Sequence, residues 1–423
     1  MLDRTIAPAS GNIVRPDLKP CEHFVLSNGV PIYYLPKGAK GVVKFEILFH
    51  SGVWHETMPG VSWFVSNMLR EGTHSKSAQQ IAEIFEYHGA FIEINPGFDH
   101  VSIAVFCMTE GYGEIIQLLF DLLTSAAFPT LELDTLKNNR AQQINVNLAK
   151  NSFVASREIR RLLFGEGHPY GRSLQPDQIP AIEKDHLVAF YESDFINTPK
   201  IYLSGDVDDT MLKKASDVYA KLEIAHKKET QKSYISTTFP EGFIEKEGSL
   251  QSSIRLGVEI PNKSHKDYYN ILITNEILGG YFSSRLMKNL REDKGYTYGV
   301  HSRPLHLLKK SFLVVSTDVM AQSTKSALIE IEKEIDILQQ ESITDQELDV
   351  VRNYMAGSFL SSISTPFELM EKFKAVHQFG LDYSYYDGLF NCLQTITPQH
   401  IQQTAQRYFS YADMSKAVVG LID

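Results

Sequence analysis

The sequence contains little cysteine and no apolar run long enough to cross a membrane. Its 423 residues include only Cys21, Cys107 and Cys392, which are far apart and form no CxxC pair. This argues against a disulfide framework or a cysteine-built zinc site, and predicts reduced thiols. VSIAVFCM is among the longest apolar stretches, far below the roughly 20 residues that a transmembrane helix needs. The opening residues MLDRTIAPAS lack the apolar core of a signal peptide, so we expect a cytoplasmic protein.

Basic residues are also fewer than acidic residues in this sequence. Lys and Arg total 41 against 51 Asp and Glu, which gives a net charge of −10. This balance argues against nucleic acid as a partner and is compatible with a cationic peptide. The composition, 43% hydrophobic and 22% charged, is typical of a soluble globular protein. The chain is too long for one core, so two or more domains are expected.

The expected elements of the first half occur again, in the same order, after residue 250. Four pairs of segments match in type: the strands KFEILFHSG and SSIRLGVEIP, the helices GVSWFVSNMLREG and DYYNILITNEILGG, the helices GYGEIIQLLFDLL and TKSALIEIEKEIDIL, and the closing strands KIYLSGDVD and KAVVGLID. The pattern indicates an internal duplication of an α+β unit. We predict domains at 1–222 and 251–423, joined by a charged and polar linker at 223–250.

One stretch of the second half, residues 278–302, places an arginine close to a tyrosine. Arg291 lies late on an expected helix, Gly295 is a left-handed stop, and Tyr298 lies on the following strand. The turn between them can bring a guanidinium and a phenol to one point, where they would form a clamp for a carbonyl or oxyanion. Tyr296 competes with Tyr298 by the two-residue period of a strand. The same spacing also fits a surface arginine and a half-buried aromatic ring. The apolar stripe that faces inward on this helix is expected to be Leu286, Met287 and Leu290.

The segment SSRLMKNLREDKGYTYGV, the stretch GHPYGR at 167–172 and the duplication make the chain similar to the M16 metallopeptidases. That family includes pitrilysin, insulin-degrading enzyme and the mitochondrial processing peptidase. The resemblance covers nearly the whole chain and implies an α+β fold of two duplicated domains, each an antiparallel β-sheet backed by α-helices (LuxS/MPP-like metallohydrolase fold). It also implies that Arg291 and Tyr298 occupy the positions of the family's Arg/Tyr pair, and that 167–172 is a surface loop.

The zinc motif of the family is missing from its usual place. The family carries His-x-x-Glu-His on a helix and a Glu ligand about 75 residues later, a pattern that binds zinc and activates water. By the resemblance, the ligand positions fall here on Trp63, Asn67 and Gln143, with Gln142 as the alternative, and the base position falls on Ser66. An indole only donates, neutral amides are poor zinc ligands, and a serine without a base is inert near neutral pH. We therefore expect no zinc or other cofactor in this chain.

The histidines give no second metal site. The chain has 14, and pairs such as His50 with His55 and His301 with His306 are five residues apart, a spacing that suits neither one helical face nor one strand face. We expect each of them to be structural.

Two functions remain open. In the first, the chain is the non-catalytic subunit of an M16-type metallopeptidase, and Arg291 and Tyr298 act in trans at the zinc of a partner subunit during hydrolysis of unfolded peptides. In the second, the chain is a catalytically inactive protein that binds peptides or acts as a scaffold, and one version of this hypothesis makes it a homodimer. The partners implied are a zinc-bearing M16 chain or a second copy, together with a peptide, and neither nucleic acid nor membrane.

Overall fold

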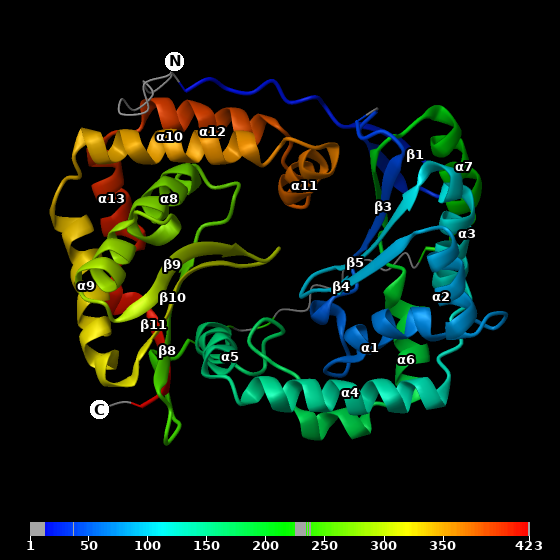
Figure 1. Cartoon of the computed structure of the whole chain (residues 1–423), viewed down its shortest axis with the longest axis horizontal. Coiled ribbons are helices and arrows are strands. Elements are labelled where there is room, and N and C mark those ends of the chain that lie inside the picture. The colour runs from blue at the N-terminus through cyan, green and yellow to red at the C-terminus, as the bar shows by residue number, and fades with distance from the viewer. Residues whose placement is uncertain (1–12, 37, 225–233, 235, 237, 422–423) are drawn as a thin grey trace, which may run out of the picture. The chain divides into compact units, whose positions relative to one another are not determined.

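The computed structural model describes residues 13–36, 38–224, 234, 236 and 238–421 and divides into two compact units. The N-terminal unit comprises Lys19–Gly242 together with Thr365–Lys372. The C-terminal unit comprises Phe243–Ser364 together with the described residues before Lys19 and from Phe373 onward. Each unit is an α+β layer structure with its own apolar core (Figure 1).

The N-terminal unit is built on a six-stranded sheet with the order β1-β2-β6-β3-β5-β4. The strands are β1 (Glu22–Val25), β2 (Pro31–Tyr34), β3 (Val42–Phe49), β4 (Phe91–Pro96), β5 (Val101–Met108) and β6 (Lys200–Gly205). Neighbours are antiparallel except β2 and β6, which run parallel. All but the first residue of β3 are buried, and Lys44 and Glu46, which alternate with Val43, Phe45 and Ile47, pair with each other at 2.8 Å.

The helices of this unit pack against the sheet and against one another. They are α1 (Val61–Met68), α2 (Ala78–Tyr87), α3 (Tyr112–Thr124), α4 (Thr130–Leu148), α5 (Asn151–Phe164), α6 (Lys184–Phe190) and α7 (Asp209–Tyr219). Short 3-10 or π turns lie at Val53–His55, Leu69–Glu71, Thr109–Gly111, Pro176–Ala181 and Tyr191–Phe195. Figure 1 shows α2, α3 and α7 gathered against the sheet. The amphipathic spacing of α3 buries Ile115, Leu119 and Leu122 completely, which fixes its orientation on the core.

The C-terminal unit has a five-stranded sheet with the order β7-β11-β8-β10-β9. The strands are β7 (Glu241–Glu245), β8 (Gln251–Ile260), β9 (Thr297–His306), β10 (Ser311–Met320) and β11 (Ser415–Gly420). The helices are α8 (Tyr268–Asn275), α9 (Thr324–Gln340), α10 (Asp345–Ser361), α12 (Ser384–Thr395) and α13 (Pro398–Tyr408). Helix α11 (Pro366–His377) begins in residues assigned to the N-terminal unit and ends in residues of the C-terminal unit. There are 3-10 turns at Ala321–Ser323 and Tyr411–Asp413, and π-helical segments at Glu276–Gly280 and Met287–Asp293. Helix α13 packs against α8 and α9.

The predicted duplication is confirmed by the sheets. The order β6-β3-β5-β4 of the first sheet corresponds to β11-β8-β10-β9 of the second, and in both the long central strands pair antiparallel. The edge strands β4 and β9 therefore hold equivalent positions in the two sheets.

Part of the stretch predicted as a linker is structured. Residues 241–245 form β7, whereas 225–233, 235 and 237 lie outside the described residues. The three cysteines are free thiols, and Cys107 is buried in the core. None of the helices in the described ranges is long and apolar enough to cross a membrane.

Candidate functional site

The positions of the missing zinc motif lie on α1, and their side chains bond to their own helix. The buried hydroxyl of Ser66 donates to the carbonyl of Ser62, and the side-chain amide of Asn67 donates to the carbonyl of Trp63. Each bond spans four residues, the reach of a short polar side chain to the preceding turn. Ser66 is therefore a hydrogen-bond donor to the backbone, and no base of the described residues pairs with it to activate it.

Trp63 is packed against an arginine. The guanidinium carbon of Arg140, on α4, lies 4.2 Å from the centre of the indole ring, within the range of a cation–π contact. Arg140 also donates from Nη1 to Oε1 of Gln143 at 2.7 Å. The structure therefore brings three of the four sequence-predicted positions, Trp63, Asn67 and Gln143, into one chain of contacts, with Arg140 at its centre.

This donor set does not fit a zinc ion. A guanidinium lies over the ring that replaces the first ligand, and a cation there would repel Zn²⁺. Among the residues that the structure describes, no three His, Cys, Asp or Glu side chains are grouped so that they could hold a metal ion. Arg140 was missed in the sequence, although its place three residues before Gln143 puts both on one helical face.

The loop before α1 holds a buried carboxylate. Glu56 accepts the backbone N–H groups of Gly60 and Ser62, both at 3.1 Å, and pairs with Arg172 at 3.0 Å. Burial raises the pKa of Glu56 to about 6, and the charge of Arg172 and the two N–H bonds oppose that rise. Gly60 has φ +89°, the left-handed conformation that lets the chain turn into α1.

The stretch at 167–172 does not form the surface loop that was expected. His168 and Tyr170 are buried, and Tyr170 donates its hydroxyl to the carboxylate of Asp99. Gly171 sits so close to the carbonyl of Gly165 that a Cβ would lie 2.0 Å from that oxygen. The motif therefore packs into the unit and carries Arg172 to Glu56.

Arg291 lies on the π-helical segment Met287–Asp293. The stripe that was expected to face inward is buried, as predicted: Leu286, Met287 and Leu290. Gly295 has φ +65° and ends the segment, as predicted. The guanidinium of Arg291 lies 4.7 Å from the ring centre of Phe282, a largely exposed side chain, and has no hydrogen-bond or carboxylate partner among the described residues.

The two candidate tyrosines differ in their exposure to solvent. Tyr298 is 91% exposed, and its hydroxyl has no partner within the described part of the chain. Tyr296 is half-buried and packs against the core of the C-terminal unit. The pairing register of β9 with β10 shifts between Thr317 and Val319, which places Tyr298 in a β-bulge of β9. Tyr296 precedes β9, so the two-residue period of a regular strand does not relate the two tyrosines, and their side chains have different environments.

The histidines that were weighed as ligands contact other groups. The Nε2 atom of His50 lies 3.2 Å from the Nε2 atom of His100. His306 contacts the hydroxyl of Tyr268 through one ring nitrogen. None of these contacts forms a metal-binding set within the described residues.

Two protein-family models match the chain. The model described as insulinase (peptidase family M16) covers residues 37–174, and the model described as peptidase M16 inactive domain covers residues 182–355. A protein of Bacillus subtilis named uncharacterized zinc protease YmxG is 22% identical over 397 residues, 92% of this chain and 96% of that protein. A protein of Helicobacter pylori named non-peptidase homolog YmxG is 23% identical over 369 residues, 85% of this chain and 84% of that protein.

Solved structures share the fold. A peptidase M16 inactive domain from Pseudomonas fluorescens superposes with a TM-score of 0.85 at 21% identity, over 95% of this chain and 98% of that one. A protease from Helicobacter pylori gives a TM-score of 0.84 at 16% identity, over 96% of this chain and all of that one. The α+β fold of two helix-backed sheets predicted from the sequence is thus confirmed. The chain belongs to the M16 peptidase family.

Proposed function

We propose that this chain is the zinc-less subunit of a two-chain M16 peptidase and that it presents Arg291 and Tyr298 to the zinc site of a partner chain. The observation that carries the proposal is the contrast between the two halves. The side chains at the zinc positions are engaged within their own unit, whereas Arg291 and Tyr298 have no hydrogen-bond partner among the described residues.

The chemistry of the pair suits a carbonyl that gains negative charge. A phenol hydroxyl donates one hydrogen bond and a guanidinium donates two in parallel, and both strengthen as the oxygen becomes an oxyanion. Removal of one such donor costs about 3–4 kcal/mol in the transition state, or roughly 10²–10³ in kcat. The partner would supply the zinc that activates water, so neither chain would hydrolyse peptides alone.

The substrate in this proposal is an unfolded peptide. Strand β9, which carries Tyr298, is the edge strand of its sheet, and β4 is the edge strand of the other. An edge strand leaves backbone N–H and C=O groups free to pair with an added strand. A peptide bound along β9 would run past Tyr298.

The experiment is co-expression with a zinc-bearing M16 chain, followed by isolation of the complex and a peptide-cleavage assay. We expect cleavage by the complex and none by this chain alone. The matched controls are Arg70→Ala, on an arginine of the N-terminal unit whose side chain is 50% exposed, and Tyr87→Phe, which removes a hydroxyl from a tyrosine that is 86% exposed. An intact complex whose turnover is the same with Arg291→Ala as with Arg70→Ala would overturn the clamp.

A second function is favoured by the name of one relative, the non-peptidase homolog of Helicobacter pylori. In that case the chain binds peptides without cleaving them, alone or as a homodimer. Peptide binding by the purified chain, combined with failure to associate with any zinc-bearing M16 chain, would select this function.

A further inference from the structure

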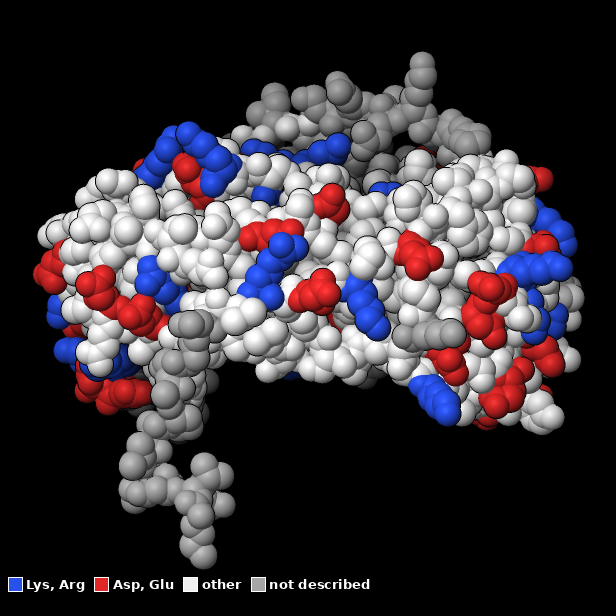
Figure 2. Space-filling model, turned by 90° about the horizontal axis from the view of Figure 1, so that it is seen from above, with Lys and Arg blue, Asp and Glu red and all other residues white. Residues whose placement is uncertain are grey.

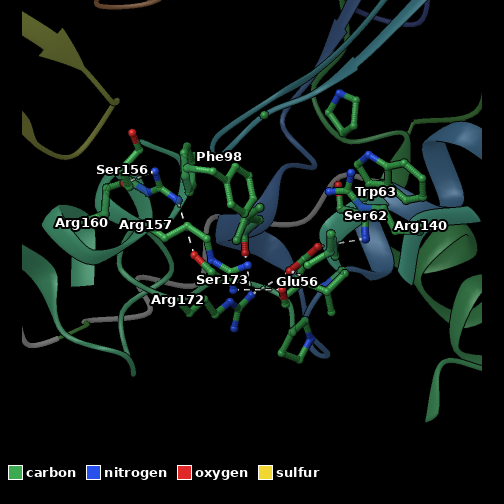
Figure 3. Close-up of a pocket in the computed structure, with 18 residues that line it drawn as sticks. Glu56, Ser62, Trp63, Phe98, Arg140, Ser156, Arg157, Arg160, Arg172 and Ser173 are labelled. Carbon is green, nitrogen blue, oxygen red and sulfur yellow. Dashed lines mark hydrogen bonds and ion pairs between the residues drawn. The ribbon is translucent and has the colours of Figure 1, made fainter. Parts of the chain in front are cut away.

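A pocket lies beside Trp63, within the N-terminal unit. Its volume is about 340 Å³, the size of a small-ligand site. Its walls come from the loop before α1, the turn between β4 and β5, helices α4 and α5, and the stretch after Gly171 (Figure 3). The pocket is distinct from the surface that carries Arg291 and Tyr298, which belongs to the C-terminal unit.

Four arginines line this pocket: Arg140, Arg157, Arg160 and Arg172. Glu56 is the one carboxylate among the described lining residues, and it is paired with Arg172. No carboxylate of the described chain lies within ion-pair distance of Arg140, Arg157 or Arg160. These three arginines are half-buried, and removal of a charge from water is costly unless the charge is compensated.

Aromatic rings hold three of these guanidiniums. The pairs are Arg140 over Trp63 at 4.2 Å, Arg157 over Phe153 at 5.6 Å and Arg160 over Phe98 at 5.3 Å. A ring contacts the flat face of a guanidinium and leaves the N–H groups at its edge able to donate. The stacking therefore pre-organises donors without satisfying them.

The protein supplies too few acceptors for these donors. A guanidinium has five N–H groups. Arg157 donates to the carbonyl of Leu174, and Arg160 donates to the carbonyl of Ser156 and, at 3.4 Å, to the hydroxyl of Ser173. Arg157 and Arg160 thus have more N–H groups than the described residues offer acceptors, and a group bound in the pocket can supply further acceptors. The Nε atoms of Arg140, Arg160 and Arg172 also lack an acceptor among the described residues, but they are sealed from solvent and a ligand in the pocket would not reach them.

The positive charge is local. The chain as a whole carries a net charge of −10, and acidic and basic side chains are interspersed on the face shown in Figure 2. Inside the pocket, burial lowers the pKa of Arg140 and Arg160, and the nearby charge of Arg157 lowers both further. An anion in the pocket would replace this repulsion by attraction.

We propose that this pocket binds an oxyanion, a carboxylate or a phosphate, carried by a small ligand with an apolar or aromatic body. The arginines would donate to the anion, and the rings of Trp63, Phe98 and Phe153 would contact the body of the ligand. The site requires neither a partner chain nor zinc, so it stands or falls independently of the proposed peptidase role.

The test is calorimetric titration of the purified full-length chain with phenyl phosphate, with N-acetylphenylalanine and with the uncharged amide of N-acetylphenylalanine. We expect saturable binding of at least one anion, no comparable binding of the amide, and weaker binding at high salt. Tighter binding of phenyl phosphate identifies phosphate as the preferred group, and tighter binding of N-acetylphenylalanine identifies carboxylate.

The variants are Arg157→Gln, on a half-buried side chain, and the more deeply placed Arg160→Gln. Each should lower the affinity about tenfold or more, as expected for loss of a charge-assisted bond. Arg70→Gln changes charge by the same amount on an arginine that does not line the pocket, and should leave the affinity unchanged. Equal binding of anion and amide, absence of saturable anion binding, or equal effects of Arg157→Gln and Arg70→Gln would each overturn the proposal.

Discussion

Substitution of Trp63 and Arg140, singly and together, tests whether the contact between their side chains stabilises the N-terminal unit. Trp63 stands at the position of the family's first zinc ligand. The indole meets the guanidinium at 4.2 Å and the ring of Phe64 edge-on at 5.0 Å. Trp63→Leu keeps apolar bulk and removes the aromatic face, and Arg140→Met keeps the stem and removes the charge. A cation–π contact contributes about 0.5–1 kcal/mol when exposed and about 2 when desolvated. Since Trp63 is half-buried, we expect a coupling energy of about 1 kcal/mol in the double-mutant cycle.

Urea unfolding followed by tryptophan fluorescence measures this coupling. The chain has two tryptophans, Trp54 and Trp63, and both lie in the N-terminal unit, so the signal reports that unit in every variant. The control cycle pairs Trp63→Leu with Arg70→Met, which should be additive within about 0.3–0.5 kcal/mol. A Trp63–Arg140 coupling no larger than that of the control would refute the contact.

Two further predictions concern stability. Burial lowers the pKa of His100 to about 3, so the N-terminal unit loses stability through this group as the pH falls below about 6.5, the ordinary value of a histidine. The contribution of His100 to that loss is about 2 kcal/mol at pH 5, and it is measured by urea unfolding as the difference in pH dependence between the wild type and His100→Asn. An equal pH dependence in the two proteins would contradict the assignment. Gly171→Ala places a Cβ against the carbonyl of Gly165 and should destabilise the N-terminal unit by about 1–3 kcal/mol. Gly167→Ala is the control, because a Cβ there meets nothing within 4 Å and should have little effect on stability. Equal midpoints of urea unfolding for the two variants would contradict the close packing at Gly171.

The elements could be predicted where hydrophobic periodicity is strong. The apolar spacing of 112–124 predicts α3, and the stripe of Leu286, Met287 and Leu290 predicts the buried face before Gly295. The repeated order of elements predicts two related sheets. These features are local, or they compare the chain with itself, so one sequence is sufficient to find them.

The features that were missed depend on contacts between distant residues. Lys44 of β3 pairs at 2.7 Å with Glu371, in the short segment 365–372 that belongs to the N-terminal unit, and nothing in the local pattern links the two. The arginine pocket is assembled from α4, α5 and the stretch after Gly171, which only the fold brings together. In the sequence, the arginines that line this pocket cannot be distinguished from arginines on the protein surface.

The zinc positions show both the strength and the limit of sequence reasoning. The residue types exclude the ligands of the family, which follows from the chemistry of indole, amide and hydroxyl groups. What replaces the metal does not follow from residue type. The contact of Arg140 with Trp63 requires that α1 and α4 face each other, which is a property of tertiary packing.

The most direct test of the central claim is the turnover number of the complex with a zinc-bearing M16 chain when Tyr298 is replaced by Phe. The substitution removes one hydroxyl from a side chain that is 91% exposed, so folding and assembly should be unaffected. We predict that kcat falls by about 10² or more with little change in KM, while Tyr87→Phe leaves both unchanged. Unchanged turnover in an intact Tyr298→Phe complex would contradict the account.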